Sequence, residues 1–144
     1  MNSILLNTAT RYVGPLLLAL SLILLYRGHN LPGGGFIGGL MAASAVILHA
    51  YARGWGELER SLPIDPLFLM TSGLALAMLS GLFGVFLGDG YMQGLWLPPF
   101  KAVLIGKVKL GTPLLFDIGV YLTVIGFAVK CALALGTHNE SWNS

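Results

Sequence analysis

Long apolar runs separated by short polar connections dominate the chain. A helix needs about 20 mostly apolar residues to cross the hydrocarbon core of a bilayer. Four runs reach this length, at residues 4–26, 35–52, 67–88 and 112–136. They lack the alternation of barrel strands, and an apolar run in lipid must satisfy its own backbone hydrogen bonds. The pattern predicts an all-α membrane protein with four transmembrane helices in one domain, residues 1–144, with both termini on the same side of the membrane.

The predicted connections differ in length and character. Residues 27–34 form a short turn, residues 53–66 a polar link, and residues 89–111 the longest connection. Within the last, residues 102–110 carry β-branched side chains around Gly106-Lys107. Such a pattern is typical of strands joined by a turn. We expect a short β-hairpin there, against the membrane surface.

Composition agrees with the bilayer as the solvent. Of the 144 residues, 56% are hydrophobic and 10% charged, whereas a soluble domain carries roughly a quarter charged residues. The first apolar run lacks the basic flank and cleavage pattern of a signal peptide, so we expect it to be retained. Cys131 is the single cysteine, which excludes an intrachain disulfide and a cysteine metal site. The eight basic residues form no run, which gives nucleic-acid binding no support.

Small residues recur at every fourth position of the second and third predicted spans. Close contact between membrane helices depends on such positions, because lipid is as apolar as leucine and provides no hydrophobic drive between helices. Packing within the chain would explain part of this pattern, and docking of another protein on at least one face is the sharper hypothesis. The positions are Gly34, Gly38 and Ala42; Gly35, Gly39 and Ala43; Gly73, Ala77 and Gly81; and Ser80, Gly84 and Gly88.

Four ionisable residues lie within the predicted spans, where a charge is costly and suggests a function. Asp117 lies about one and a half turns inside the fourth span, either as a helix-start carboxylate or as a group that exchanges a proton for a cation. Lys130 snorkels to the interface or lies on an ion path. His49 is an interfacial histidine or a proton relay. Arg11 precedes Pro15 by four residues, so we expect a kink, with Arg11 reaching headgroups or a partner's carboxylate.

A glycine-rich segment precedes the second span. Residues 28–40 read GHNLPGGGFIGGL, in which Pro32 ends any preceding helix and the three glycines at 33–35 permit backbone angles closed to other residues. A phosphate-binding loop has little support, because no Gly-Lys-Ser/Thr follows. The segment predicts a re-entry turn at the start of a membrane helix.

Together with TPLLFDIGVY at residues 112–121, this segment resembles the MnhB/MrpB subunit of the Mrp (Mnh) multisubunit sodium/proton antiporter family. The resemblance covers nearly the whole chain. It implies a prokaryotic cytoplasmic-membrane complex of several different subunits, in which large subunits carry the proton channels. Related subunits also look to occur in membrane-bound hydrogenase and sulfur-reducing complexes.

The residue candidates follow from these patterns. The glycine-rich turn and Asp117 match the family pattern, while a lysine/glutamate pair of a complete proton pump is missing from the spans. The ion-path candidates are Asp117, His49 and Lys130. The candidates for subunit packing or a structural motif are His29, Asn30, Pro32, Gly33, Gly34, Gly35, Phe36, Gly38, Gly39, Gly73, Gly81 and Gly84.

The favoured function is an accessory, noncatalytic subunit of a sodium/proton antiporter, which packs against other hydrophobic subunits and lines part of the cation route. We expect no cofactor and no metal. One alternative is the equivalent subunit of a hydrogenase or sulfur-reducing complex, and another is a stand-alone homo-oligomeric channel. An enzyme is disfavoured, because His29, His49 and His138 are widely separated and no nucleophile and base come together in the sequence.

Overall fold

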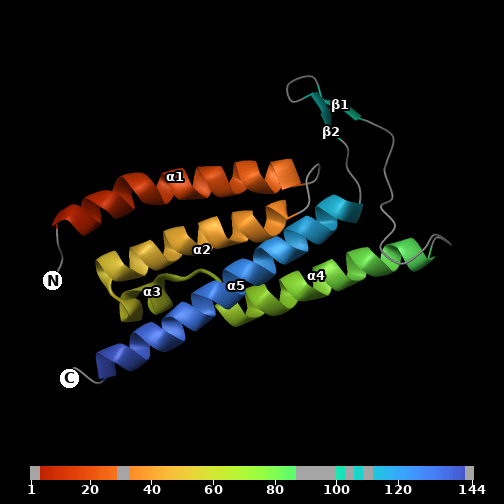
Figure 1. Cartoon of the computed structure of the whole chain (residues 1–144). Coiled ribbons are helices and arrows are strands. Elements are labelled where there is room, and N and C mark those ends of the chain that lie inside the picture. Colours follow the sequence, from red (N-terminus) through yellow and green to blue (C-terminus); the bar gives the residue numbers. More distant parts are fainter. Residues whose placement is uncertain (1–3, 29–32, 87–99, 103–105, 109–111, 142–144) are drawn as a thin grey trace.

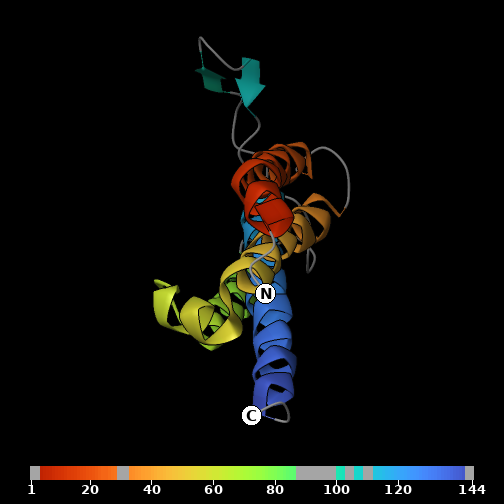
Figure 2. The same ribbon diagram turned by 90° about the vertical axis from the view of Figure 1, so that its left-hand side faces the viewer.

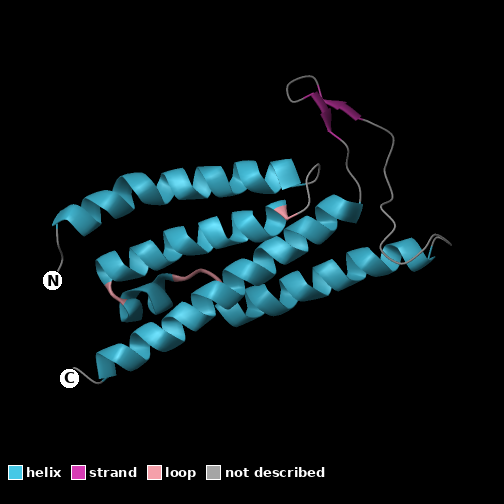
Figure 3. Ribbon diagram, viewed as in Figure 1, coloured by secondary structure: helices cyan, strands magenta, loops and turns pink. Residues whose placement is uncertain are grey.

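The computed structural model describes residues 4–28, 33–86, 100–102, 106–108 and 112–141, and nearly all of them are helical (Figure 3). Its helices are α1 Ile4–Gly28, α2 Gly34–Arg53, α3 Trp55–Ser61, α4 Pro66–Phe86 and α5 Thr112–Ser141. The long helices α1, α2, α4 and α5 confirm the four predicted helical segments. The sequence analysis missed α3, which lies in the polar link.

Among the described residues, three helices are long and apolar enough to cross a membrane: α1, α2 and the Pro113–His138 part of α5. The short helix α3 and the first part of α4 are bent by 56° at the break between them, and they add a fourth span if the pair is counted as one. The described residues therefore form a mainly helical, multi-pass layer with three to four candidate spans.

The helix boundaries follow from local chemistry. A carboxylate oxygen of Asp65 accepts a hydrogen bond from the Leu67 amide at 2.9 Å, and Pro66 follows as the first residue of α4. An acidic cap and a proline at the first helical position favour a helix start. Gly33 and Gly54 precede α2 and α3 with φ of 96° and 102°, where a side chain would be strained. Pro15 does not end a helix: it lies inside α1, which continues past it to Gly28.

The four long helices form a row in which each packs on the next. α1 packs on α2, α2 on α5, and α5 on α4, and the described residues show no contact between α1 and α4. Figures 1 and 2 show α1 at one edge of this row and α4 at the other, with both chain ends at the same end of the layer. In the part of the chain that the structure describes, the long helices form a layer, with a smaller contact between α1 and α5, and they do not close into a bundle.

The small residues of α2 bring its backbone close to two neighbours. In the first row, which contains Gly34, Gly38 and Ala42, a Cβ added at Gly38 would lie 2.8 Å from the Ser21 carbonyl oxygen of α1. In the second row, which contains Gly35, Gly39 and Ala43, a Cβ at Gly39 would lie 2.9 Å from the Tyr121 carbonyl oxygen of α5. Both rows of α2 are therefore covered by helices of this chain. The sequence hypothesis expected another protein on at least one small-residue face, and neither row of α2 is free for it.

Glycines also mediate the contact between α4 and α5. A Cβ at Gly73 would lie 2.7 Å from the Gly119 carbonyl oxygen, and one at Gly126 would lie 2.5 Å from the Met70 amide nitrogen. Gly81 is buried in α4, and Gly84 belongs to the same helix, but its surroundings fall outside what the structure describes. The α4 small-residue face is thus also used within the chain.

A small apolar cluster joins α2, α3 and α5. Its buried members are Ala43, Ala50, Leu58, Val129 and Leu133. Burial of Leu58 explains why the short segment is helical, since most helical stability in proteins comes from packing of an apolar face.

The aromatic ring of Trp55, the first residue of α3, lies against Gly136 near the end of α5. A larger residue at Gly136 would clash with this ring. The absence of a side chain there therefore allows α3 to pack closely on the end of α5. Both elements lie at the end of the layer where the chain begins and ends (Figure 1).

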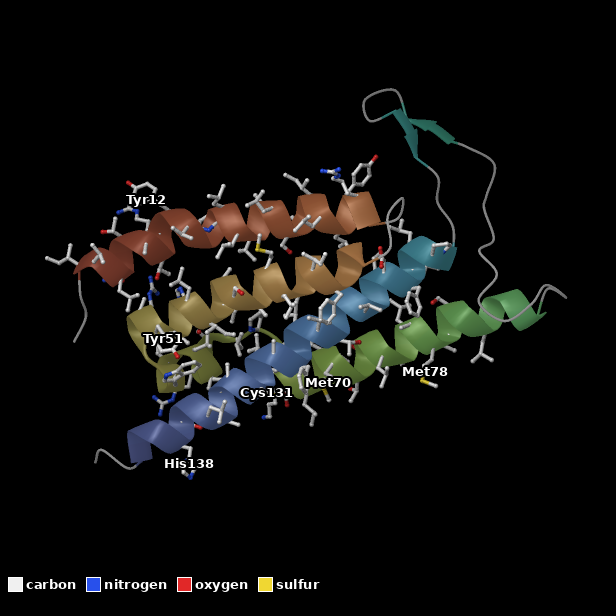
Figure 4. All side chains as sticks on the ribbon, viewed as in Figure 1. Tyr12, Tyr51, Met70, Met78, Cys131 and His138 are labelled. Atoms are coloured by element: carbon white, nitrogen blue, oxygen red, sulfur yellow. The ribbon has the colours of Figure 1, made fainter. Side chains whose placement is uncertain are left out.

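The two edges of the layer carry exposed side chains. Figure 4 shows Tyr12 of α1 and Met78 of α4 pointing outward on opposite sides, and they are 71% and 59% exposed. In α1, 11% of the residues of the candidate span are buried within the chain, against 44% in α2. The helix in the middle of the row thus has two neighbours, whereas the edge helices face the surroundings.

Two short strands lie in the long connection, at β1 Phe100–Ala102 and β2 Gly106–Val108. They are antiparallel, with Phe100 opposite Val108 and Ala102 opposite Gly106. Gly106 and Lys107, the centre of the predicted hairpin, belong to β2, and residues 103–105 lie outside the described residues. A lone pair of strands is marginally stable at best in water, so the helices determine this fold.

We expect Gly39→Ala to destabilise the detergent-solubilised protein by about 1–3 kcal/mol, because the added methyl group overpacks the contact between α2 and α5. The matched control is Gly14→Ala in α1, where an added Cβ has no neighbour within 4 Å. This control should be neutral or stabilising by up to about 1 kcal/mol, since alanine favours helix. Thermal unfolding of both variants measures the difference, and equal midpoints would contradict the close contact at Gly39.

Candidate functional site

The two motifs singled out in the sequence meet in space. Asp117 of α5 lies against the end of α1 and the start of α2, and a Cβ added at Gly28 would lie 2.5 Å from its carboxylate oxygen Oδ2. A Cβ at Gly35 would contact the main-chain carbonyl of Asp117. The absence of side chains at these glycines therefore leaves the space that the half-buried Asp117 occupies.

The start of α2 places positive charge density beside this carboxylate. The Ile37 amide donates to the Gly33 carbonyl at 3.1 Å, so the preceding amides of the first turn have no carbonyl partner within the helix. A Cβ at Gly28 would lie 3.0 Å from the Gly34 amide nitrogen and 2.5 Å from Asp117 Oδ2, so these two atoms flank the same point. A carboxylate near a helix N-terminus gains about 1 kcal/mol from the helix dipole.

A polar contact lies one helical turn further along α5. The hydroxyl groups of Tyr121 and Ser21 are hydrogen-bonded at 2.8 Å, and Ser21 is completely buried. Gly38 makes room for the tyrosine ring, whose Cδ2 would lie 3.4 Å from a Cβ at that position. Residues four apart share a helix face, so Asp117 and Tyr121 both face the glycine-rich start of α2.

Sequence reasoning missed this hydrogen bond. Its signal was a serine within the apolar run of the first span and a tyrosine four residues after Asp117. Buried hydroxyl groups in a membrane pair with other polar groups. That rule indicates a partner for Ser21 but leaves its identity open, and the structure supplies it.

The other ion-path candidates lie elsewhere. His49 is half-buried and lies 14 residues beyond Gly35 in α2, which corresponds to about 21 Å along the helix. Lys130 is exposed, 13 residues or about 20 Å beyond Asp117 on α5. The structure therefore does not bring Asp117, His49 and Lys130 together.

Part of the predicted glycine motif lies outside the described residues. His29, Asn30 and Pro32 belong to residues 29–32, of which nothing is described, and Phe36 is exposed on the first turn of α2. In the described residues, no group of three or more histidine, cysteine, aspartate or glutamate side chains is placed to hold a metal ion. The described site thus consists of Asp117, Tyr121 and the surrounding glycines.

Comparisons with known proteins agree over most of the chain. A family model described as a domain related to the MnhB subunit of Na+/H+ antiporter matches residues 5–130. The chain belongs to the MnhB family. A relative from Alkalihalophilus pseudofirmus, named as the B-type subunit of a Na(+)/H(+) antiporter, is 39% identical over 134 residues, which cover 93% of this chain and 92% of the relative.

Two further comparisons extend the MnhB match. The protein of the same name from Bacillus subtilis is 34% identical over 94% of both chains. A chain in the structure of the Mrp complex from Dietzia sp. DQ12-45-1b aligns with a TM-score of 0.76 and 31% identity. That alignment covers 92% of this chain but 14% of the Dietzia chain. The MnhB fold therefore also occurs as a small part of a much longer chain.

We expect Tyr121→Phe to lower stability by about 1 kcal/mol, because it leaves the buried Ser21 hydroxyl without this partner. Tyr12→Phe is the matched control, since Tyr12 is 71% exposed and should change nothing. The double variant Tyr121→Phe with Ser21→Ala should be less destabilised than the sum of the two single variants. Thermal unfolding of this MnhB-family chain in mild detergent tests the cycle, and strict additivity would argue against the hydrogen bond.

Proposed function

We propose that the chain is an accessory, noncatalytic subunit of a multisubunit sodium/proton antiporter in the cytoplasmic membrane of a prokaryote. Relatives of nearly equal length that are named as B-type antiporter subunits support this proposal. The complex would exchange external protons for cytoplasmic sodium, driven by the proton motive force. In this proposal α4 is the fourth transmembrane helix, and its 21 residues correspond to a length of about 31 Å, enough to cross the bilayer.

The observation that carries the proposal is the single layer of helices. An ion route through a membrane must be surrounded by protein, because polar groups and ions are costly in lipid. The row α1, α2, α5, α4 is not closed by a contact between α1 and α4 in the described residues. Such a layer completes a route only when other subunits cover one face, which favours an accessory subunit over a self-contained carrier.

Asp117 is the residue we assign to the cation route. It is the only acidic residue within the four predicted spans, and it is held against the glycines at the junction of α1 and α2. A carboxylate in a poorly hydrated site is able to bind a proton or a cation in turn. The close approach of backbone at Gly28 and Gly35 limits the space around it, as a selective site requires.

Composition of the purified complex tests the accessory role. A tagged version of the chain, purified in mild detergent, should co-elute with several unlike hydrophobic subunits. A symmetric complex of this chain alone would contradict the proposal and support a homo-oligomeric channel. Co-elution with iron–sulfur or nickel subunits would instead assign the chain to a redox complex.

Asp117→Asn tests the role of the carboxylate in transport. We expect sodium-dependent proton exchange in everted membrane vesicles to fall to near background, because the amide cannot take up and release a proton at neutral pH. Glu57→Gln is the matched control, since it makes the same chemical change at an exposed position of α3 and should leave exchange unchanged. Normal exchange by an assembled Asp117→Asn complex would limit Asp117 to a structural role.

A further inference from the structure

A pocket of about 790 Å³ lies at the opposite end of α2 from Asp117. Its volume is within the range of small-molecule sites, roughly 300–1,000 Å³. It lies between the first 15 residues of α1, the second half of α2, and α3 with the residue that follows it. The lining residues are Ile4, Asn7, Thr8, Thr10, Arg11, Gly14, Pro15, Leu18, Ala45, Val46, His49, Arg53, Leu58 and Leu62.

The described lining of the pocket contains basic side chains and no acidic ones. Arg11 of α1 and Arg53 at the end of α2 line it together with His49, one helical turn before Arg53. Across the described ranges, no carboxylate forms an ion pair with either arginine. Guanidinium groups stay charged at every physiological pH, so the pocket holds two positive charges that nothing described in this chain neutralises.

Beyond the arginines and His49, the lining consists of the polar side chains Asn7, Thr8 and Thr10 in the first part of α1 and of apolar residues that extend toward the middle of the layer. Leu18 lies 14 residues beyond the start of α1, or about 21 Å along the helix. Ala45 lies eight residues before Arg53 in α2, or about 12 Å. The pocket therefore runs from positive charge near the end of α2 to apolar side chains deeper in the layer, which is the polarity profile of a phospholipid.

The position of the pocket beside the end of a candidate span indicates its depth in the membrane. Arg53 is the last residue of α2 and is followed at once by Gly54 and the short helix α3, which carries Glu57, Glu59 and Arg60 on its exposed positions. A charged seven-residue helix at the end of a membrane span belongs at the level of the headgroups. The basic end of the pocket is therefore at the depth of lipid phosphates.

We propose that this pocket binds a phospholipid with an anionic headgroup. The phosphate accepts hydrogen bonds from the guanidinium groups of Arg11 and Arg53, with His49 beside them, and an acyl chain lies along Leu18 and Val46. Basic pockets between membrane helices bind anionic headgroups in this way. Two permanent positive charges repel sodium, so the pocket and its histidine lie off the cation route. The lipid site does not depend on the antiport function.

The first experiment identifies what occupies the pocket in the assembled complex. A photo-crosslinking amino acid replaces Leu18, which is 45% exposed and lines the pocket, and the complex is irradiated in native membranes. We expect an adduct with the mass of a phospholipid on this chain. An adduct with another protein would overturn the proposal, because a partner subunit would then fill the pocket.

The second experiment measures the role of the arginines. The purified complex is stripped of lipid and titrated with phosphatidylglycerol or phosphatidylcholine, and bound lipid is counted by native mass spectrometry. The wild type should prefer phosphatidylglycerol, and the variants Arg11→Gln and Arg53→Gln should each weaken its binding by about fivefold. Arg60→Gln is the matched control, because Arg60 is exposed on α3 and does not line the pocket.

The outcomes separate the proposed site from general charge attraction. Equal binding of the two lipids by the wild type, or an equal loss in Arg60→Gln, would overturn the proposal. Inorganic phosphate added to the wild type should fail to displace phosphatidylglycerol, because the acyl chain contributes to binding. Full displacement would assign the arginines to a free anion instead. Co-purification of the other subunits with each variant shows that it is folded and assembled.

Discussion

The close approach of α2 to both of its neighbours is the contact on which the rest of the structure depends. Lipid provides no hydrophobic drive that brings helices together, so their association depends on van der Waals contact between closely spaced backbones. The first row of small residues allows α1 to approach, and the second row allows α5 to approach. Because the two rows are offset by one residue, they lie about 100° apart around α2. α1 and α5 therefore pack on neighbouring faces of α2 and also contact each other through Ser21 and Tyr121.

The same contacts create the environment of Asp117. Gly28 and Gly35 leave room for its carboxylate and main chain, and the first turn of α2 provides positive charge density next to it. A side chain at either glycine would displace the carboxylate or separate the helices. The requirement for small residues at the α1–α2 junction is therefore both a packing requirement and, in the proposed function, a requirement of the ion route.

The two candidate sites lie at opposite ends of the layer. Asp117 lies near the start of α2, while Arg11 and Arg53 line the pocket toward its other end, about 26 Å away along the helices. An acidic group suits a cation route, and basic groups suit lipid phosphates. Proteins and lipids around the layer are thus expected to have distinct positions, with partner subunits closing the route at Asp117 and lipid completing the surface near α3.

The amino-acid sequence by itself determined the helical segments, because the length of an apolar run and the need to satisfy its backbone hydrogen bonds are local properties. It also identified the glycines as contact positions and Asp117 as the acid within a span, but it missed α3, which burial of Leu58 against α5 stabilises. Only the tertiary structure decided that Gly28 lies beside Asp117 and that Ser21 pairs with Tyr121. The sequence periodicity shows which face of a helix carries small or polar residues. Any of several neighbouring helices is able to cover such a face. The choice among them depends on how all the backbones fit together at once, and this is a property of the folded layer.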